Sequence, residues 1–68
     1  MNWRAIVGGN VRRLRLAKKL TQEQVALEAG IDLTYVGGIE RGKKNPSLEV
    51  MVKVGKVLGV GPADLLRR

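Results

Sequence analysis

The sequence contains neither cysteine nor histidine, and these absences narrow the chemistry open to it. Without cysteine there is no disulfide, no thiolate metal ligand and no thiolate nucleophile. Without histidine the commonest general base and metal ligand is missing. We find no set of residues for acid–base or nucleophilic catalysis, and we therefore expect no enzyme activity, no metal site and no cofactor.

Long hydrophobic runs are missing as well. A helix that spans a bilayer needs about 20 consecutive apolar residues, and this chain has no such run and no charged-then-apolar leader. A domain of this size hides only about 60% of the surface of its unfolded chain, so its core must be small. We expect a single domain over residues 1–68, without membrane attachment, in the cytoplasm.

Acidic residues are few compared with basic ones. The chain has 13 Lys and Arg against 6 Asp and Glu, which gives a formal net charge of +7. The cations cluster between Arg12 and Lys19, between Arg41 and Lys44, and at the last two residues. Net charge informs about partners rather than about fold, and a compact basic domain is typical of proteins that bind nucleic acid or an anionic membrane surface.

Apolar residues recur every three or four positions, and no segment alternates as a strand does, so the pattern predicts an all-α fold. Four positions near the N-terminus share one face by this spacing: Trp3, Val7, Val11 and Leu14. Gly8 and Gly9 weaken that helix, each costing up to about 1 kcal/mol relative to alanine. The same spacing predicts core positions further along: Leu20, Val25, Ala26, Val36, Ile39, Leu48, Met51, Val54 and Leu58.

Capping signals divide the middle of the chain into two short helices. Thr21 followed by Gln24 is the signature of a capping box that begins a helix, and Gly30 is a typical left-handed stop. The pattern repeats at once, since Asp32 is placed to cap a second helix that runs to about Glu40 or Arg41 and that Gly42 ends. Two helices joined by a turn of about three residues have the spacing of a helix-turn-helix, whose second helix can enter a major groove.

Two further helices complete the pattern. Ser47 is placed to cap a helix that Gly59 ends. Pro62 suits the first position of a last helix of one or two turns. Together with the first segment, the sequence therefore predicts five short helices.

The segment from Leu20 to Val60, "LTQEQVALEAGIDLTYVGGIERGKKNPSLEVMVKVGKVLGV", resembles the helix-turn-helix of the Cro/C1-type (Xre-like) DNA-binding transcriptional regulators. The ordered blocks "TQEQ-A-AG", "IERG-NPSL" and "LGV" carry the likeness, and "NVRRLR" before them extends it over nearly the whole chain. The resemblance implies a compact five-helix, lambda-repressor-like domain. It also implies a two-fold homodimer that binds double-stranded DNA with its third helix in the major groove.

The resemblance further implies roles for individual residues. Four of them occupy the base-reading positions: Asp32, Leu33, Thr34 and Gly38. Others occupy positions that contact phosphates, at the start of the second helix and after the third: Gln22, Arg41, Lys43, Lys44 and Asn45. We add Tyr35, whose hydroxyl is placed to contact a phosphate rather than only to pack or to stack.

Arg15 is open to three interpretations: a solvated charge, a phosphate contact, or a structural ion pair. The family tends to pair the arginine of "LR" with the glutamate of "IE", here Arg15 with Glu40. We favour this pair, because a buried bidentate bond would lock the first helix to the third.

Gly37 and Gly38 remove side chains from the outer face of the expected base-reading helix. At Gly38 the family commonly carries a side chain that touches DNA. Either direct reading contracts to the first turn of the helix, or the bare surface lets its backbone approach DNA more closely. In both cases we expect few direct base contacts and a larger share of specificity from DNA shape.

A two-fold dimer also needs a surface outside the DNA-binding helices. The last helices offer four apolar candidates: Val50, Val57, Leu65 and Leu66. An alternative function is a protein-interaction module, such as an antitoxin-type component, which would keep the core and expose an apolar patch. We infer no small-molecule ligand.

Overall fold

The computed structural model describes residues 1–68 and contains five α-helices and no strand. In chain order the helices are α1 (Trp3–Ala17), α2 (Gln22–Ala29), α3 (Leu33–Glu40), α4 (Leu48–Leu58) and α5 (Pro62–Leu65). The predicted all-α, five-helix fold is confirmed. No helix combines the length and the apolar character that crossing a membrane requires.

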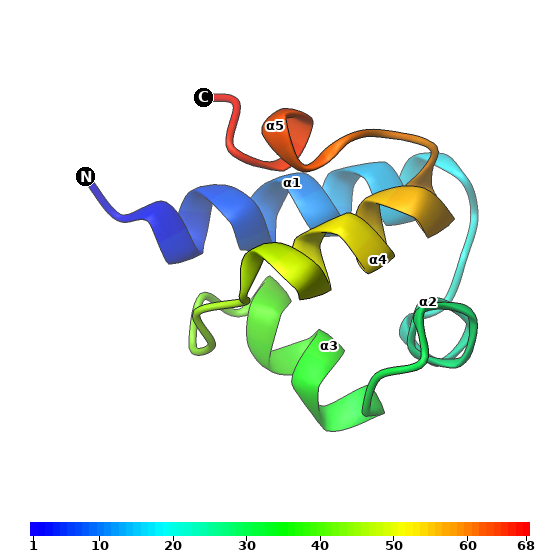
Figure 1. Ribbon diagram of the computed structural model, residues 1–68. Coiled ribbons are helices and arrows are strands. Elements are labelled where there is room, and N and C mark those ends of the chain that lie inside the picture. The colour runs from blue at the N-terminus through cyan, green and yellow to red at the C-terminus, as the bar shows by residue number, and fades with distance from the viewer.

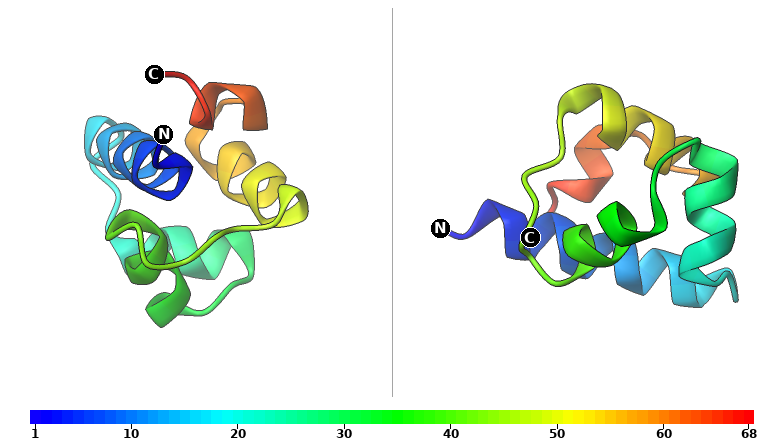
Figure 2. Two further views of the ribbon diagram at one scale, coloured as in Figure 1. Left: turned by 90° about the vertical axis from the view of Figure 1, so that its left-hand side faces the viewer. Right: turned by 90° about the horizontal axis from the view of Figure 1, so that it is seen from below.

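The helices fall into two groups around a shared core. In Figure 1, α1, α4 and α5 occupy the upper part of the molecule, and α2 and α3 lie beneath them. Figure 2 shows the same grouping from two other sides, and its right-hand view looks onto α2 and α3. α3 packs against both α1 and α2, so one of its faces is held while the other lies at the periphery.

Side-chain caps begin three of the helices, two of them as predicted. The Gln24 N–H donates to the Thr21 hydroxyl over 3.0 Å, and the Thr21 N–H donates to the Gln24 side chain over 2.7 Å, which completes the capping box. The Val50 N–H donates to the Ser47 hydroxyl over 3.1 Å at the start of α4. Asn2 caps α1 in the same way, with 3.1 Å between its side-chain oxygen and a first-turn nitrogen, a start that the hydrophobic pattern did not reveal.

Residues in the left-handed conformation separate the helices. Gly30 after α2 has a φ of +71° and Gly59 after α4 has a φ of +76°, as predicted. Gly42 after α3 also has a φ of +71°. Lys19, between α1 and α2, has a φ of +58° although it is not glycine, and no sequence signal announced this turn.

Ten buried side chains, drawn from all five helices, form the core: Val7, Val11, Val25, Ala26, Ala29, Val36, Ile39, Val54, Leu58 and Leu65. The prediction of Leu48 as a core residue is wrong, since Leu48 is 65% exposed. It belongs to the first turn of α4, whereas α4 places its fully buried residues in its second half. Leu20 and Met51 pack against the edge of the core, and Trp3 is half exposed.

α1 and α3 cross closely at Gly8. A Cβ atom added at Gly8 would overlap the carbonyl oxygen of Ile39, whereas one added at Gly9 would meet nothing within 4 Å. The glycine that weakens α1 as an isolated helix is therefore required by the packing of the fold. The close crossing brings the C-terminal end of α3 against α1.

Candidate nucleic-acid interface

α2 and α3 form the predicted helix-turn-helix. α2 ends at Ala29 and α3 begins at Leu33. The Ile31 N–H donates back to the Ala26 carbonyl over 3.0 Å, which fixes the turn between them. In Figure 1 this turn holds α3 at the lower edge of the molecule.

One face of α3 is turned toward the core and the other is turned outward. Val36 and Ile39 are each 1% exposed and define the inner face. The opposite face begins at Thr34, and the two residues of the predicted base-reading set that precede it, Asp32 and Leu33, are exposed as well. It continues through Gly37 and Gly38, which lie three and four positions after Thr34 and so on the same side of the helix.

Gly37 and Gly38 are nevertheless buried, because cationic side chains from the end of α3 lie over them. A Cβ atom added at Gly37 would lie 3.0 Å from the Nη1 atom of Arg41 and 3.7 Å from the Oε1 atom of Gln22. One added at Gly38 would lie 2.7 Å from the Cγ atom and 3.4 Å from the Cε atom of Lys44. The expectation of a bare surface at this point is therefore wrong, since the space is filled by Arg41 and Lys44.

The segment after α3 turns back over the helix because of the hydrogen bonds that end α3. The Gly42 N–H donates to the Ile39 carbonyl over 3.0 Å, and the Lys43 N–H donates to the Gly38 carbonyl over 2.8 Å. With Gly42 in the left-handed conformation, these two bonds form a Schellman motif. The Lys44 N–H also donates to the Gly38 carbonyl, over 3.2 Å, so the backbone of Lys44 is anchored to the residue that its side chain covers.

The start of α3 differs from the prediction. Asp32 occupies the N-cap position, but its side chain makes no capping hydrogen bond. Its carbonyl oxygen accepts from the N–H groups of Tyr35 and Val36, each over 3.1 Å. The exposed Asp32 carboxylate is consequently free to accept a bond from outside the chain, while Tyr35 is half-buried against the core.

The predicted ion pair between Arg15 and Glu40 is present. Arg15 donates from Nε to one Glu40 carboxylate oxygen over 2.6 Å and from Nη2 to the other over 3.0 Å. Its Nη1 atom donates to the Leu20 carbonyl over 2.9 Å. The two side chains are 10% and 3% exposed, so this bidentate bond links the end of α1 to the end of α3 away from water.

Gln22 also contacts this ion pair, and the sequence did not predict that contact. The side-chain N–H of Gln22 donates to a Glu40 carboxylate oxygen over 3.0 Å. No spacing signal relates these residues, because they come from different helices. The bond orients the Gln22 amide at the first position of α2, the place where a phosphate contact is expected.

The electrostatics of the cluster keep Glu40 charged. Burial opposes ionisation most strongly, but the hydrogen bonds from Arg15 and Gln22, together with the positive charges of Arg15 and Arg12, outweigh it and lower the pKa of Glu40. The hydrogen bond to Glu40 likewise raises the pKa of Arg15, against the effect of its own burial. Both partners are ionised at neutral pH.

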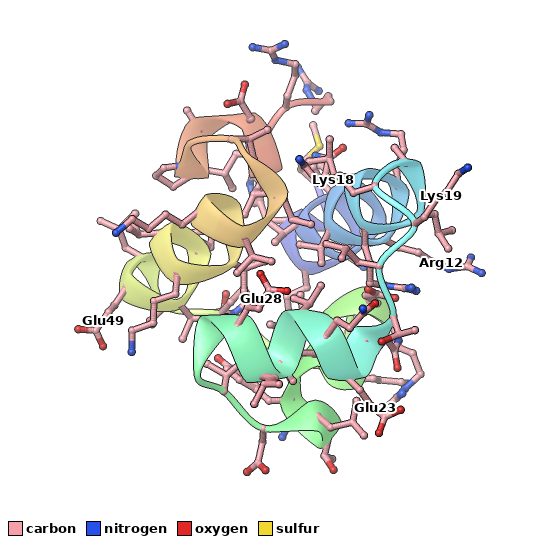
Figure 3. The ribbon with its side chains drawn as sticks, turned by 90° about the vertical axis from the view of Figure 1, so that its right-hand side faces the viewer. Arg12, Lys18, Lys19, Glu23, Glu28 and Glu49 are labelled. Carbon is pink, nitrogen blue, oxygen red and sulfur yellow. The ribbon has the colours of Figure 1, made fainter.

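The cations beside α3, by contrast, have no acidic partner. The one other ion pair joins Arg67 to Asp64 over 3.2 Å near the C-terminus. Three exposed cations at the end of α3 have no acidic partner: Arg41, Lys43 and Lys44. Asn45, the next residue, is also exposed. Figure 3 shows further charged side chains on other helices: Arg12, Lys18 and Lys19 on the α1 side, and Glu23, Glu28 and Glu49 on α2 and α4.

The predicted dimer surface needs a correction at Leu65. This side chain is fully buried, because α5 folds back onto α1 and completes the core. The Asn10 side chain holds that arrangement by donating to the carbonyl oxygens of Leu65 and Arg67, each over 2.8 Å. Leu66 is 38% exposed, and Val50 and Val57 are half-buried.

Known proteins are similar to this chain in sequence and in architecture. A family model described as helix-turn-helix, HTH_3, matches residues 11–65. Control protein C.BamHI of Bacillus amyloliquefaciens is 46% identical over 66 residues, which cover 96% of this chain and 82% of that protein.

Solved structures agree with this match. The restriction-modification controller protein C.AhdI from Aeromonas hydrophila has a TM-score of 0.87 at 42% identity, over 91% of this chain and 94% of that one. SinR, a master regulator for biofilm formation solved in complex with DNA, has a TM-score of 0.85 at 32% identity, over 90% of this chain and 98% of that one. This chain therefore belongs to the HTH_3 helix-turn-helix family of Cro/C1 type and is a DNA-binding transcriptional regulator.

Proposed function

We propose that the protein binds a palindromic operator as a two-fold dimer, with α3 of each copy in a major groove. The observation that carries this proposal is the outer face of α3, which presents exposed side chains at its start and uncompensated cations at its end. Residues 1–68 act as one DNA-binding unit, located in the cytoplasm on nucleoid DNA.

The first turn of α3 supplies direct base contacts in this proposal. The Leu33 side chain packs on a thymine methyl group, and Thr34 bonds a base edge or offers its own methyl group to thymine. Asp32 accepts from the amino group of cytosine, a role supported by the absence of a capping bond. Gly38 brings no side chain of its own to the groove.

Phosphate contacts flank this turn. Gln22, oriented by Glu40, and the N-terminus of α2 bind one phosphate. Arg41, Lys43 and Asn45 follow the DNA backbone after α3, and the Tyr35 hydroxyl adds a further contact. Each phosphate that the chain neutralises adds about 0.9 to the slope of log affinity against log salt.

Dimerisation supplies the selectivity that one helix lacks. A single α3 contacts few base pairs, and two copies related by a two-fold axis read half-sites about 34 Å apart. Val50, Val57 and Leu66 are candidates for the shared surface. Since relatives of this chain are named as control proteins of restriction-modification systems, we extend that regulatory context to this protein.

Selection of bound sequences from a random pool of duplex DNA, repeated at two salt concentrations, tests the proposal. We expect a palindromic consensus and an affinity that falls linearly with salt on logarithmic axes. Sedimentation of the free and the DNA-bound protein measures the number of copies on the consensus duplex. Absence of any enriched sequence together with salt-independent binding would contradict the proposal.

A further inference from the structure

We propose that Lys44 reads a guanine in the major groove, in place of the side chain that Gly38 lacks. The inference rests on the proposed docking of α3 and deepens it, since it names the group that acts at the vacant base-reading position. It also separates Lys44 from Lys43, which sequence reasoning grouped together as phosphate contacts.

The first support is the course of the Lys44 side chain. Its Cγ and Cε atoms would lie 2.7 Å and 3.4 Å from a Cβ atom at Gly38, and its Cδ atom 3.6 Å away. The aliphatic part of Lys44 thus runs across the site of the missing side chain rather than away into solvent. The ammonium group is one bond beyond Cε, so it extends from the outer face of α3 near position 38.

The second support is the anchoring of the backbone. Both Lys43 and Lys44 donate their N–H groups to the carbonyl oxygen of Gly38. The Schellman motif at Gly42 therefore determines where the side chain of Lys44 begins. A lysine whose backbone is anchored in this way has fewer positions to sample than a lysine on an unanchored loop.

The third support is that Lys44 covers Gly38 on the outer face of α3. Gly38 lies four positions after Thr34, on the side of α3 opposite the core residues Val36 and Ile39. In the proposed complex this side faces the base edges, whereas the phosphates lie along the flanks of the helix. Lys44 has no acidic partner within the chain, so its ammonium group is free to bind DNA.

The chemistry of the ammonium group determines which base it selects. Lysine offers three donors and no acceptor. In the major groove guanine presents two acceptors, O6 and N7, and this pairing of lysine with guanine is one of the common specific contacts. We therefore assign Lys44 to a G·C pair within each half-site.

The test measures binding to the selected consensus duplex and to duplexes changed at each G·C pair in turn. At one pair, we expect Lys44→Ala to reduce the discrimination between the two duplexes about tenfold or more. Lys43→Ala is the matched control, since it removes the same charge one residue away. It should weaken binding to all duplexes by the same factor and lower the salt slope by about 0.9.

Replacing the guanine at that pair by 7-deazaguanine removes the N7 acceptor and keeps Watson–Crick pairing. The unmodified chain should lose affinity for this duplex relative to the consensus, and Lys44→Ala should not distinguish the two. A Lys44→Ala variant that weakens binding to every duplex by one common factor would show a phosphate contact only and overturn the inference.

Gly38→Ala tests the role of the glycine. The added methyl group would lie 2.7 Å from the Cγ atom of Lys44, so a side chain rather than backbone must move, and a melting curve checks that the variant is folded before its binding is measured. It should lose discrimination at the same G·C pair, and in the Lys44→Ala background it should cause no further loss. Full discrimination by Gly38→Ala would overturn the placement of Lys44 over Gly38.

The unmodified chain distinguishes failure of this inference from failure of the proposed function. If it neither prefers any duplex nor responds to salt, DNA recognition by α3 itself is refuted. If it selects a consensus and Lys44→Ala retains that preference in full, the role of Lys44 alone is refuted.

Discussion

The two faces of α3 differ in what lies beside their glycine contacts and in whether their charges are paired. On the inner side, α1 approaches through Gly8 until its backbone meets the Ile39 carbonyl, and the buried Arg15–Glu40 pair holds the two helices together. On the outer side, the stem of a flexible lysine covers Gly38, and the cations are unpaired. The inner face therefore depends on rigid packing, whereas the outer face can rearrange.

The comparison teaches that the neighbour of a glycine determines what a substitution does. Where the neighbour is backbone, an added methyl group must push two helices apart. Where it is a long side chain, the side chain can rotate away, and the cost is least where the contact is with its far end. Substitutions of the same kind should then have effects of opposite sign on stability.

The largest effect should come from removing the charge that holds the inner face. Glu40→Ala leaves Arg15 buried without its partner, and we expect a loss of about 3–5 kcal/mol in the free energy of unfolding. Urea denaturation measures the change. Glu28→Ala is the control, because Glu28 is exposed and has no ion pair, and its effect should stay within about 0.5 kcal/mol. Equal stability of the two variants would contradict a structural role for the pair.

The next effect concerns the crossing of α1 and α3. Gly8→Ala should destabilise the fold by about 1–3 kcal/mol, the usual cost of overpacking a close contact. Gly9→Ala, one position away and facing open space, should instead stabilise it by up to about 1 kcal/mol through helix propensity. Thermal melts of the two variants compare them directly, and a stabilising Gly8→Ala would refute the close crossing.

Acid should weaken the inner face through Glu40. Its pKa is lowered in the folded state, so its contribution to stability is fully present above the pKa of an unfolded glutamate, about 4.3. That contribution is lost as the pH falls from there through the folded pKa. Denaturation midpoints measured from pH 6 down to pH 3 should therefore fall more steeply for the unmodified chain than for Glu40→Gln. Parallel curves would show that the pKa of Glu40 does not change on folding.

The smallest effect should appear on the outer face. Gly37→Ala should raise the free energy of unfolding by up to about 1 kcal/mol, because the added methyl group crowds only the far end of Arg41. Gly38→Ala should gain less, because the Cγ atom of Lys44 lies 2.7 Å from the added methyl group and must move. Calorimetric melting temperatures provide the measurement. A loss comparable to that of Gly8→Ala would show that Arg41 and Lys44 are held as rigidly as backbone, and the contrast between the two faces would disappear.

Much of the fold could be predicted because its signals are local. The capping box at Thr21, the cap at Ser47 and the left-handed glycines at positions 30 and 59 each depend on residues a few positions apart. The predictions failed where the burial of a residue depends on neighbours that are distant in sequence. Periodicity identified the apolar face of α4, but it did not show that Leu48 lies beyond the core. It also did not show that Leu65 closes the core from α5.

The candidate site divides along the same line. The helix-turn-helix and its cationic flanks were predicted from spacing, capping and a family resemblance, and the resemblance also supplied the Arg15–Glu40 pair. The bond from Gln22 to Glu40 and the covering of the two outer glycines were not predicted. The bond from Gln22 to Glu40 depends on side chains that meet only when α2 and the end of α3 have packed, and the covering of the glycines depends on how the chain turns back after α3.

The sequence by itself determined where most of the helices begin and end and which partner the chain attracts, because caps and net charge act without a folded core. The tertiary structure alone decided that Gly8 is a contact point, that Asp32 is free and that Lys44 occupies the position of an absent side chain. The physical reason is that the role of a glycine depends on which atoms lie beside its Cα atom, and here those atoms belong to other segments of the chain.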